Sequence, residues 1–246
     1  MTSSSATIYS RLLNLSQMKN VPYTSLPNTT LNEKYNVDTN VIDGYPIVKY
    51  FGIGVMHNID LINGKRKYHQ VYDGALFNQI PFRLSTTKLT DKTLFLEVPT
   101  TINNVQYFAY YLKEASLEES KILEVSGLSG NVSVKEFDTG VVNVLNPVGY
   151  ITNNLSDKYL AIVSRLELNL SQVDMVGINE VVNILYPDGG VTLGELGVFS
   201  GKKNGDKLLQ TQLMYFSELE YPVPLLNKTT LIMDVGGQEP LGVLNG

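Results

Sequence analysis

Short runs of β-branched and aromatic residues, separated by turns, fill most of this 246-residue chain. The clearest runs lie at residues 46–51, 93–98, 105–112 and 160–170, with Asn-Gly, Asp-Gly and Gly-Gly pairs standing between many of the runs. Such runs are typical of strands, and they do not alternate regularly with helices as a parallel sheet requires. The pattern predicts a mainly β fold with antiparallel, sandwich-like sheets, one or two short helices and an extended N-terminal arm. Further strands are predicted at 131–134, 141–144, 178–185, 208–216 and 229–235.

Two short segments favour helix instead. Residues 8–18 carry apolar side chains near helical spacing, and residues 116–123 open with a Ser116-x-x-Glu119 capping box. We therefore predict a helix over each segment. The apolar residues that carry the first prediction are Ile8, Leu12, Leu15 and Met18.

Changes in composition suggest three regions. Residues 1–45 combine the first helix with a stretch rich in Pro, Ser, Thr and Asn, which we expect to lie across the domain or to be ordered by a partner subunit. A second soft segment, residues 113–130, ends in Gly-Leu-Ser-Gly. The predicted division is an N-terminal helix and arm (1–45), an N-terminal β region (46–126) and a C-terminal sandwich-like region (127–246).

The inventory of reactive side chains is small. The chain has no cysteine, no tryptophan and two histidines, which excludes disulfides, thiolate nucleophiles, cysteine zinc sites and multi-histidine metal centres. His57 and His69, with Asp60 and Asp73, show no metal-ligand spacing, so we expect ordinary polar roles for them. We predict no catalytic residue, no metal and no cofactor.

Charge and hydropathy limit the partners. Nineteen basic residues against 24 acidic ones leave a net charge of −5, which argues against nucleic acid binding. The one dense basic cluster, Lys65-Arg66-Lys67, is expected to be a solvated loop after Asn63-Gly64. No secretory signal and no apolar run long enough to span a membrane are visible, so we predict no membrane partner.

Aromatic residues provide the positive signal. The run at 105–112 places rings on both faces of one predicted strand, which suggests that a second surface covers the strand. That surface is either a subunit interface or a bound sugar, and the absence of tryptophan favours the interface. The rings are those of Tyr107, Phe108, Tyr110 and Tyr111.

Carboxylate pairs offer a third possibility. Glu118 with Glu119, or Glu218 with Glu220, could serve glycoside hydrolysis, which uses two acids. Both pairs lie in polar, surface-like stretches, where acids are usually solvated. A hydrolase is therefore the least favoured function.

Two sets of segments resemble known proteins. Residues 46–54, 69–77, 80–84 and 107–112 contain, in order, KYFGIG, an H-x-x-x-D-x-x-L-F segment leading to Pro-Phe, and AYY. In this order they resemble uncharacterised virion proteins of tailed bacteriophages. A second set is similar to strands of phage tail-fibre and baseplate-attachment domains. It comprises residues 178–181, 194–199, 222–224 and 228–233.

The resemblance implies a non-enzymatic structural protein of a tailed phage particle. It would form a homo-oligomeric ring or collar at the neck, tail or baseplate, and such a ring can also be an attachment point for fibres. The implied partners are further copies of the chain and other virion proteins, and the implied location is a virion assembled in the host cytoplasm. The alternative is a carbohydrate- or receptor-binding β-sandwich module of a virion. The residues assigned to an interface are Tyr107, Phe108, Tyr110, Tyr111, Glu195 and Phe199.

Overall fold

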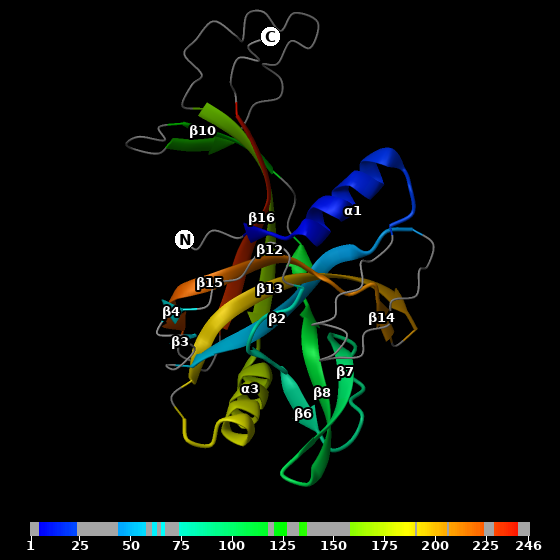
Figure 1. Cartoon of the computed structure of the whole chain (residues 1–246), viewed down its shortest axis with the longest axis vertical. Coiled ribbons are helices and arrows are strands. Elements are labelled where there is room, and N and C mark those ends of the chain that lie inside the picture. The colour runs from blue at the N-terminus through cyan, green and yellow to red at the C-terminus, as the bar shows by residue number, and fades with distance from the viewer. Residues whose placement is uncertain are drawn as a thin grey trace, which may run out of the picture. The chain divides into compact units, whose positions relative to one another are not determined.

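The computed structural model consists of two compact units (Figure 1). Unit 1 combines Met1–Ser116 with Glu167–Ile232, and unit 2 combines Leu117–Leu166 with Met233–Gly246. Most described residues lie in antiparallel strands, so the prediction of a mainly β fold is confirmed. The structure describes residues 5–23, 44–57, 61–62, 65–66, 74–117, 121–126, 133–136, 158–189, 191–205, 207–223 and 229–240.

The division into units differs from the one predicted. The first break, after Ser116, falls inside the soft segment at 113–130, but the chain then returns to unit 1 at Glu167. It returns because β13 (Val191–Asn204) pairs along nearly the whole of β2 (Ile47–His57). Strands from the two β regions predicted by sequence therefore share one sheet, and the expected boundary at 126/127 does not separate them.

Unit 1 is built on a nine-stranded antiparallel sheet. Its main path runs β1-β15-β13-β2-β8-β6, while β14 pairs with β13, β5 with β2 and β7 with β8. A separate hairpin of β3 and β4 places Lys65 and Arg66 in a strand rather than in the expected loop. The bounds are β1 Ser5–Ala6, β3 Leu61–Ile62, β4 Lys65–Arg66, β5 Gln79–Ile80, β6 Arg83–Ser85, β7 Leu94–Ile102, β8 Val105–Glu114, β14 Lys207–Leu209 and β15 Leu213–Val223.

A pair of glycines makes room for the core of this sheet. Gly52 of β2 and Gly197 of β13 are register partners. A Cβ added at either glycine would lie 2.8 or 2.9 Å from Cε2 of Phe199, too close for van der Waals contact. The ring of Phe199, which is fully buried, therefore occupies the space that the two missing side chains leave. The residues packed with Phe199 include Tyr50, Leu76, Leu112, Leu213 and Phe216.

The helix predicted at 8–18 is present as α1 (Ile8–Lys19). Its N-cap, the buried Thr7, accepts from the Ser10 N–H and donates its hydroxyl to the Leu213 carbonyl oxygen at 2.7 Å. Tyr9 and Leu13 pack in a second core cluster with Tyr23. Residues 5–23 thus belong to unit 1 and are not a detached arm, whereas the polar stretch at 24–43 lies outside the described residues.

Two helix and strand predictions are wrong. Residues 178–185, expected as a strand, lie in the helix α3 (Gln172–Leu185), which Ser171 and Asp174 open with a reciprocal capping box. Residues 116–123, expected as a helix, begin with β9 (Ser116–Leu117) and end in β10 (Lys121–Ser126). At 121–126, pairing of β10 with β12 prevails over the local helix signal, whereas at 178–185 the helix is consistent with the local capping box at its start.

Most of a second, five-stranded sheet belongs to unit 2. Its order is β11-β10-β12-β16, with β9 paired to β12. The strands predicted at 160–170 and 229–235 are confirmed, since they lie within β12 and β16, and the one predicted at 141–144 lies outside the described residues. The bounds are β11 Ser133–Glu136, β12 Lys158–Leu170 and β16 Thr229–Pro240.

Candidate functional site

The helix α1 presents apolar side chains to solvent. Ile8, Leu15 and Met18 are 46%, 51% and 83% exposed, and Val21 just beyond the helix is 44% exposed. Three of these four residues are those whose spacing predicted the helix. Exposed apolar side chains gathered on one surface indicate a contact site more often than scattered ones do. We call Ile8, Leu15, Met18 and Val21 the α1 face.

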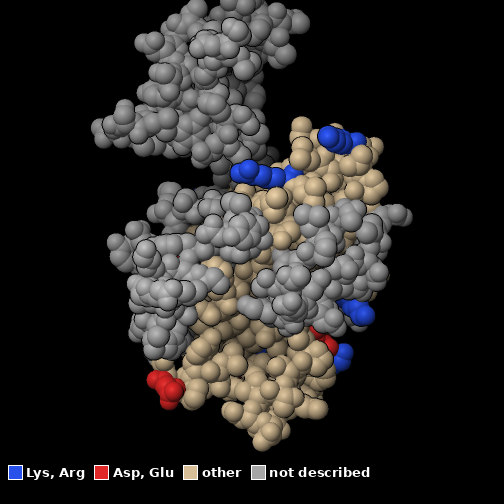
Figure 2. All heavy atoms as spheres, viewed as in Figure 1, with Lys and Arg blue, Asp and Glu red and all other residues tan. Residues whose placement is uncertain are grey.

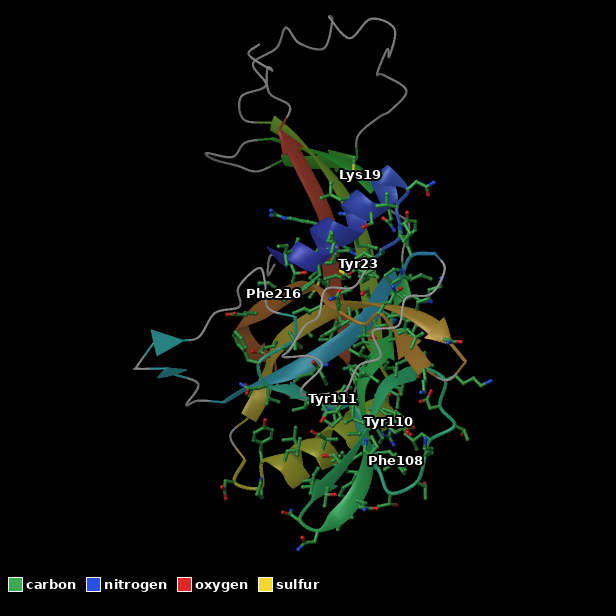
Figure 3. All side chains as sticks on the ribbon, turned by 45° about the vertical axis from the view of Figure 1, so that its right-hand side comes forward. Lys19, Tyr23, Phe108, Tyr110, Tyr111 and Phe216 are labelled. Atoms are coloured by element: carbon green, nitrogen blue, oxygen red, sulfur yellow. The ribbon has the colours of Figure 1, made fainter. Side chains whose placement is uncertain are left out.

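The charge around the α1 face is positive. Arg11 and Lys19 are exposed on the same helix, and the sequence of α1 contains no acidic residue. Figure 2 shows basic side chains on the surface over α1, and Figure 3 shows Lys19 near the end of this helix. The α1 face therefore favours a partner that is apolar and acidic.

Buried hydrogen bonds hold the segment after α1 in place, and Figure 3 labels Tyr23 within this segment. The Tyr23 hydroxyl donates to Oε1 of Gln212, and Nε2 of Gln210 donates to the Tyr23 carbonyl oxygen at 3.2 Å. Burial, with a smaller effect of Tyr9, raises the pKa of Tyr23 above its ordinary value, so the hydroxyl keeps the proton that it donates. Because this segment is anchored, the α1 face has a defined position on unit 1.

Replacing Tyr23 with phenylalanine tests this anchor. Loss of a buried hydroxyl donor is expected to lower the free energy of unfolding by about 1–3 kcal/mol. Urea unfolding followed by circular dichroism measures the change. Tyr45→Phe is the matched control, because the Tyr45 hydroxyl bonds the Ser16 and Val21 carbonyls at a less buried position. Equal losses from both substitutions would contradict the special role of Tyr23.

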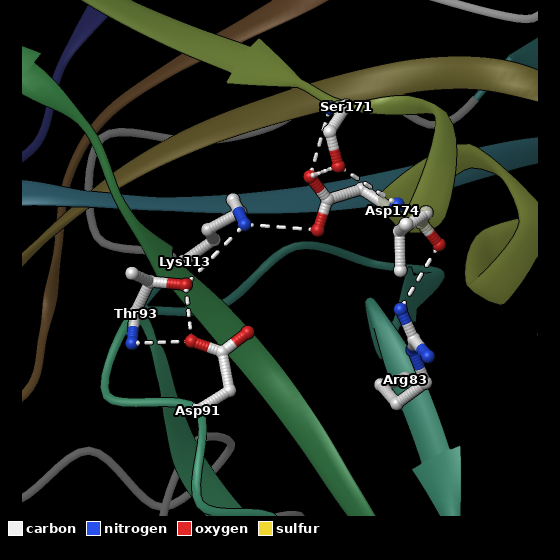
Figure 4. Close-up of polar contacts among 7 residues, drawn as sticks. Arg83, Asp91, Thr93, Lys113, Ser171 and Asp174 are labelled. Carbon is white, nitrogen blue, oxygen red and sulfur yellow. Dashed lines mark hydrogen bonds and ion pairs between the residues drawn. The ribbon is translucent and has the colours of Figure 1, made fainter.

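A polar network fixes the start of α3 to the sheet (Figure 4). Nζ of Lys113 on β8 lies 2.9 Å from Oδ1 of Asp174, and the two side chains are only 12% and 10% exposed. The other carboxylate oxygen, Oδ2, accepts from the backbone N–H and the hydroxyl of Ser171 at 2.8 and 2.7 Å. Burial alone raises the pKa of Asp174, but the hydrogen bonds from Lys113 and Ser171 outweigh it and hold the pKa below its ordinary value. Asp174 therefore both caps α3 and pairs with a cation.

A second basic residue contacts α3 from β6. Arg83 donates through Nη2 to the Val173 carbonyl oxygen at 2.9 Å (Figure 4). Its Nε lies 2.4 Å from the place where a Cβ of Gly177 would be, so a larger residue there would displace the guanidinium. These contacts and the Lys113–Asp174 pair fix the position of α3 on unit 1. Val173 and Val176 of this helix remain exposed to solvent.

The structure corrects the interface assignment for three residues. Phe199, Tyr110 and Glu195 are buried inside unit 1, so none can contact a partner in this conformation. Phe199 fills the space over the paired glycines, and the Tyr110 hydroxyl donates to Glu97 at 3.1 Å. Glu195 Oε2 accepts from the Asn78 N–H at 3.2 Å. Alternating apolar and aromatic residues indicate burial, but they do not say which surface covers them.

The other three assigned residues are half-buried. Tyr107, Phe108 and Tyr111 lie along β8, where Figure 3 labels Phe108 beside Tyr110 and Tyr111. Tyr111 packs against the core cluster of Phe199, and Nζ of Lys88 lies 5.4 Å from the centre of the Phe108 ring. Both faces of β8 are thus covered largely by the chain itself. This leaves little open aromatic surface on which a sugar could stack.

Two glutamates lie opposite each other on neighbouring strands, in a pairing that the sequence did not predict. Glu195 on β13 and Glu218 on β15 are register partners, so their side chains leave the same face of the sheet. Glu195 lies over Gly54, where an added Cβ would come within 2.6 Å of its Oε2. The candidate carboxylate pair in the sequence analysis was Glu218 with Glu220. Spacing along one strand does not reveal which residue lies opposite on the neighbouring strand. The side chains of Glu118, Glu119 and Glu220 lie outside the described residues.

The described residues were also compared with the requirements of a metal site and of a membrane-spanning helix. Among the residues that the structure describes, no three His, Asp or Glu side chains are grouped to hold a metal ion. The side chain of His57, and all of His69, Asp60 and Asp73, lie outside that part of the chain. Neither described helix has the length and apolar character needed to cross a membrane.

Fold and surface define a mainly β protein whose principal sheet carries a helix with an outward apolar, basic face. The chain belongs to a family of unknown function, DUF7208, whose model matches residues 1–243. No curated protein and no solved structure matches the chain significantly. The matched residues include the sequence of both units.

Proposed function

We propose that this chain is a non-enzymatic structural protein of a tailed phage particle. It assembles with further copies of itself into a ring or collar at the neck, tail or baseplate, and it contacts other virion proteins there. The motif order KYFGIG, H-x-x-x-D-x-x-L-F and AYY supports the phage assignment by resemblance. The observation that carries the assembly assignment is the α1 face. Covering the exposed apolar side chains of Leu15 and Met18 with a partner removes them from water, which lowers the free energy of the assembled state.

The position of the α1 face suits assembly. α1 lies against β15, and the Tyr23 anchor holds the segment that follows it. An apolar surface on a fixed element loses little conformational entropy on binding. In this proposal, the Lys113–Asp174 and Tyr23–Gln212 contacts stabilise the fold of the unit that assembles, and they have no catalytic role.

Replacing Leu15 and Met18 with glutamine tests the assembly assignment. Glutamine keeps helix propensity and removes apolar contact, so the oligomer is expected to dissociate at concentrations where the unmodified chain stays assembled. Light scattering after gel filtration and native mass spectrometry measure the subunit number. Val105→Gln is the control, because Val105 is an exposed apolar residue of unit 1 on β8, away from α1.

The phage assignment has its own test. Mass spectrometry of purified particles from the phage that encodes the chain should detect it in a fixed ratio to the other virion proteins. A chain that is monomeric at every concentration and absent from particles would overturn the proposed function.

A further inference from the structure

A second exposed apolar surface lies on α3. Val173 and Val176 are 65% and 52% exposed and stand three residues apart, so they are neighbours on one side of the helix. Glu180, one turn further on, is also exposed. We call Val173, Val176 and Glu180 the α3 face.

The α3 face has the opposite charge to the α1 face. The sequence of α3 contains two acidic residues and no basic one, and of the two acids Asp174 is buried in its pair with Lys113 while Glu180 is exposed. The sequence of α1 contains two basic residues, Arg11 and Lys19, and no acidic one. Within its own sequence, each helix thus carries apolar side chains beside exposed charges of a single sign, and the two signs are complementary. Arg83 of β6 also reaches α3, where its Nη2 donates to the Val173 carbonyl oxygen.

The two faces lie on different edges of the unit 1 sheet. α1 packs on β15, next to one end of the strand path, and α3 packs on β6 at the other end. Figure 1 shows them on opposite sides of the strands β13 and β2. Because both helices are seated by the contacts described above, one copy cannot bring its own two faces together.

We propose that the α1 face of one copy docks against the α3 face of the next copy. This rests on the proposed function, since it names the two surfaces through which the ring assembles. Val173 and Val176 cover Leu15 and Met18, while Glu180 approaches Arg11 or Lys19. A contact between two α1 faces would oppose basic residues, and one between two α3 faces would oppose Glu180 with itself, so the unlike pairing is favoured. Such head-to-tail contacts between different surfaces generate closed rings or open filaments.

Charge reversal at each face tests the pairing. Arg11→Glu and Glu180→Arg, each made alone in the full chain, place like charges across the contact. Each is expected to weaken self-association about 10-fold or more, as sedimentation or light-scattering titrations measure it. The double variant Arg11→Glu/Glu180→Arg restores an opposite pair and is expected to recover most of the lost association. An equimolar mixture of the two single variants should form mixed contacts, because both faces of each variant then meet an opposite charge on the other.

The control reverses a charge away from both faces. Lys92→Glu changes an exposed lysine in the turn before β7 by the same two charge units as Arg11→Glu, and it should leave the association constant unchanged. Circular dichroism and thermal melting confirm that each variant folds, since all three positions are exposed.

The outcomes separate this inference from the proposed function. If the unmodified chain assembles and the single reversals have no effect, or if the double variant is no better than the singles, the α1–α3 pairing is wrong while ring assembly stands. If the unmodified chain is monomeric throughout, the proposed function fails first. Saturable binding of a monomeric chain to vesicles with anionic headgroups, lost in Arg11→Glu, would assign the α1 face to a lipid surface and overturn the pairing.

Discussion

Replacing Lys113 with methionine is expected to lower the free energy of unfolding by about 3–5 kcal/mol, the usual cost of breaking a buried ion pair from one side. Methionine keeps much of the length of the lysine stem but leaves Asp174 without its cation. The carboxylate then keeps its bonds to Ser171 alone, in a position where burial already disfavours its charge. The attachment of α3 to β8 should weaken as a result.

Urea unfolding followed by tyrosine fluorescence and circular dichroism measures this loss. Lys88→Met is the matched control, since Lys88 pairs with Glu97 but is largely exposed. Exposed ion pairs contribute about 0–1 kcal/mol, so the control should change little. Similar effects from the two substitutions would show that the Lys113–Asp174 pair has no special weight.

The pH dependence of stability gives an independent readout of the same pair. The pKa of Asp174 is lower in the folded chain than its ordinary value. The unfolded chain therefore takes up this proton first as the pH falls, and the pair's contribution is complete above the unfolded pKa of about 3.9. It is lost as the pH falls through the folded pKa. Lys113→Met should flatten this part of the acid unfolding profile, whereas Lys88→Met should leave it unchanged.

Truncating Phe199 to alanine is expected to cost about 3–5 kcal/mol, the range for removing a fully buried aromatic ring. The ring lies over Gly52 and Gly197, which have no side chains to fill the cavity that its loss would leave. Strand pairing between β2 and β13 prevents the backbone from closing that cavity.

The expected result distinguishes a core residue from an interface residue. Phe199→Ala should lower the thermal midpoint of unfolding at every protein concentration, because the lost contacts lie within one unit. Val105→Ala, at an exposed site on β8, should shift the midpoint little. A Phe199→Ala chain that melts normally but fails to assemble would instead restore the original interface assignment.

Local sequence predicted the elements whose signals are strong and unopposed. The runs at 105–112 and 160–170 lie within β8 and β12, and the helix at 8–18 is α1. The capping signals were less reliable. Ser116, the first residue of the Ser116-x-x-Glu119 motif, lies in the strand β9, and β10 follows the motif. Ser171-x-x-Asp174 opens α3 instead. A capping box stabilises a helix end by only about 1 kcal/mol, so sheet pairing or packing decides the outcome.

The candidate site was only partly predictable. The apolar spacing that predicted α1 is correct, but the side that faces the sheet is the one with Tyr9 and Leu13, not the one with Leu15 and Met18. Both sides of the helix carry apolar residues, so the helical period alone could not choose between them. The α3 face is not predictable from the sequence patterns used above, because they place no helix over residues 171–177, where Val173 and Val176 lie, and favour a strand over 178–185.

The amino-acid sequence by itself determines that this chain is mainly β, that it has no cysteine chemistry, and that its first helix can bury one side and still present apolar residues on the other. Only the tertiary structure decides which residues are covered. Burial depends on pairing between segments far apart in the chain, such as β2 with β13, and on the helices that cover their sheet. This is why Phe199, Tyr110 and Glu195 became part of the interior, and why Leu15 and Met18 were left on the surface.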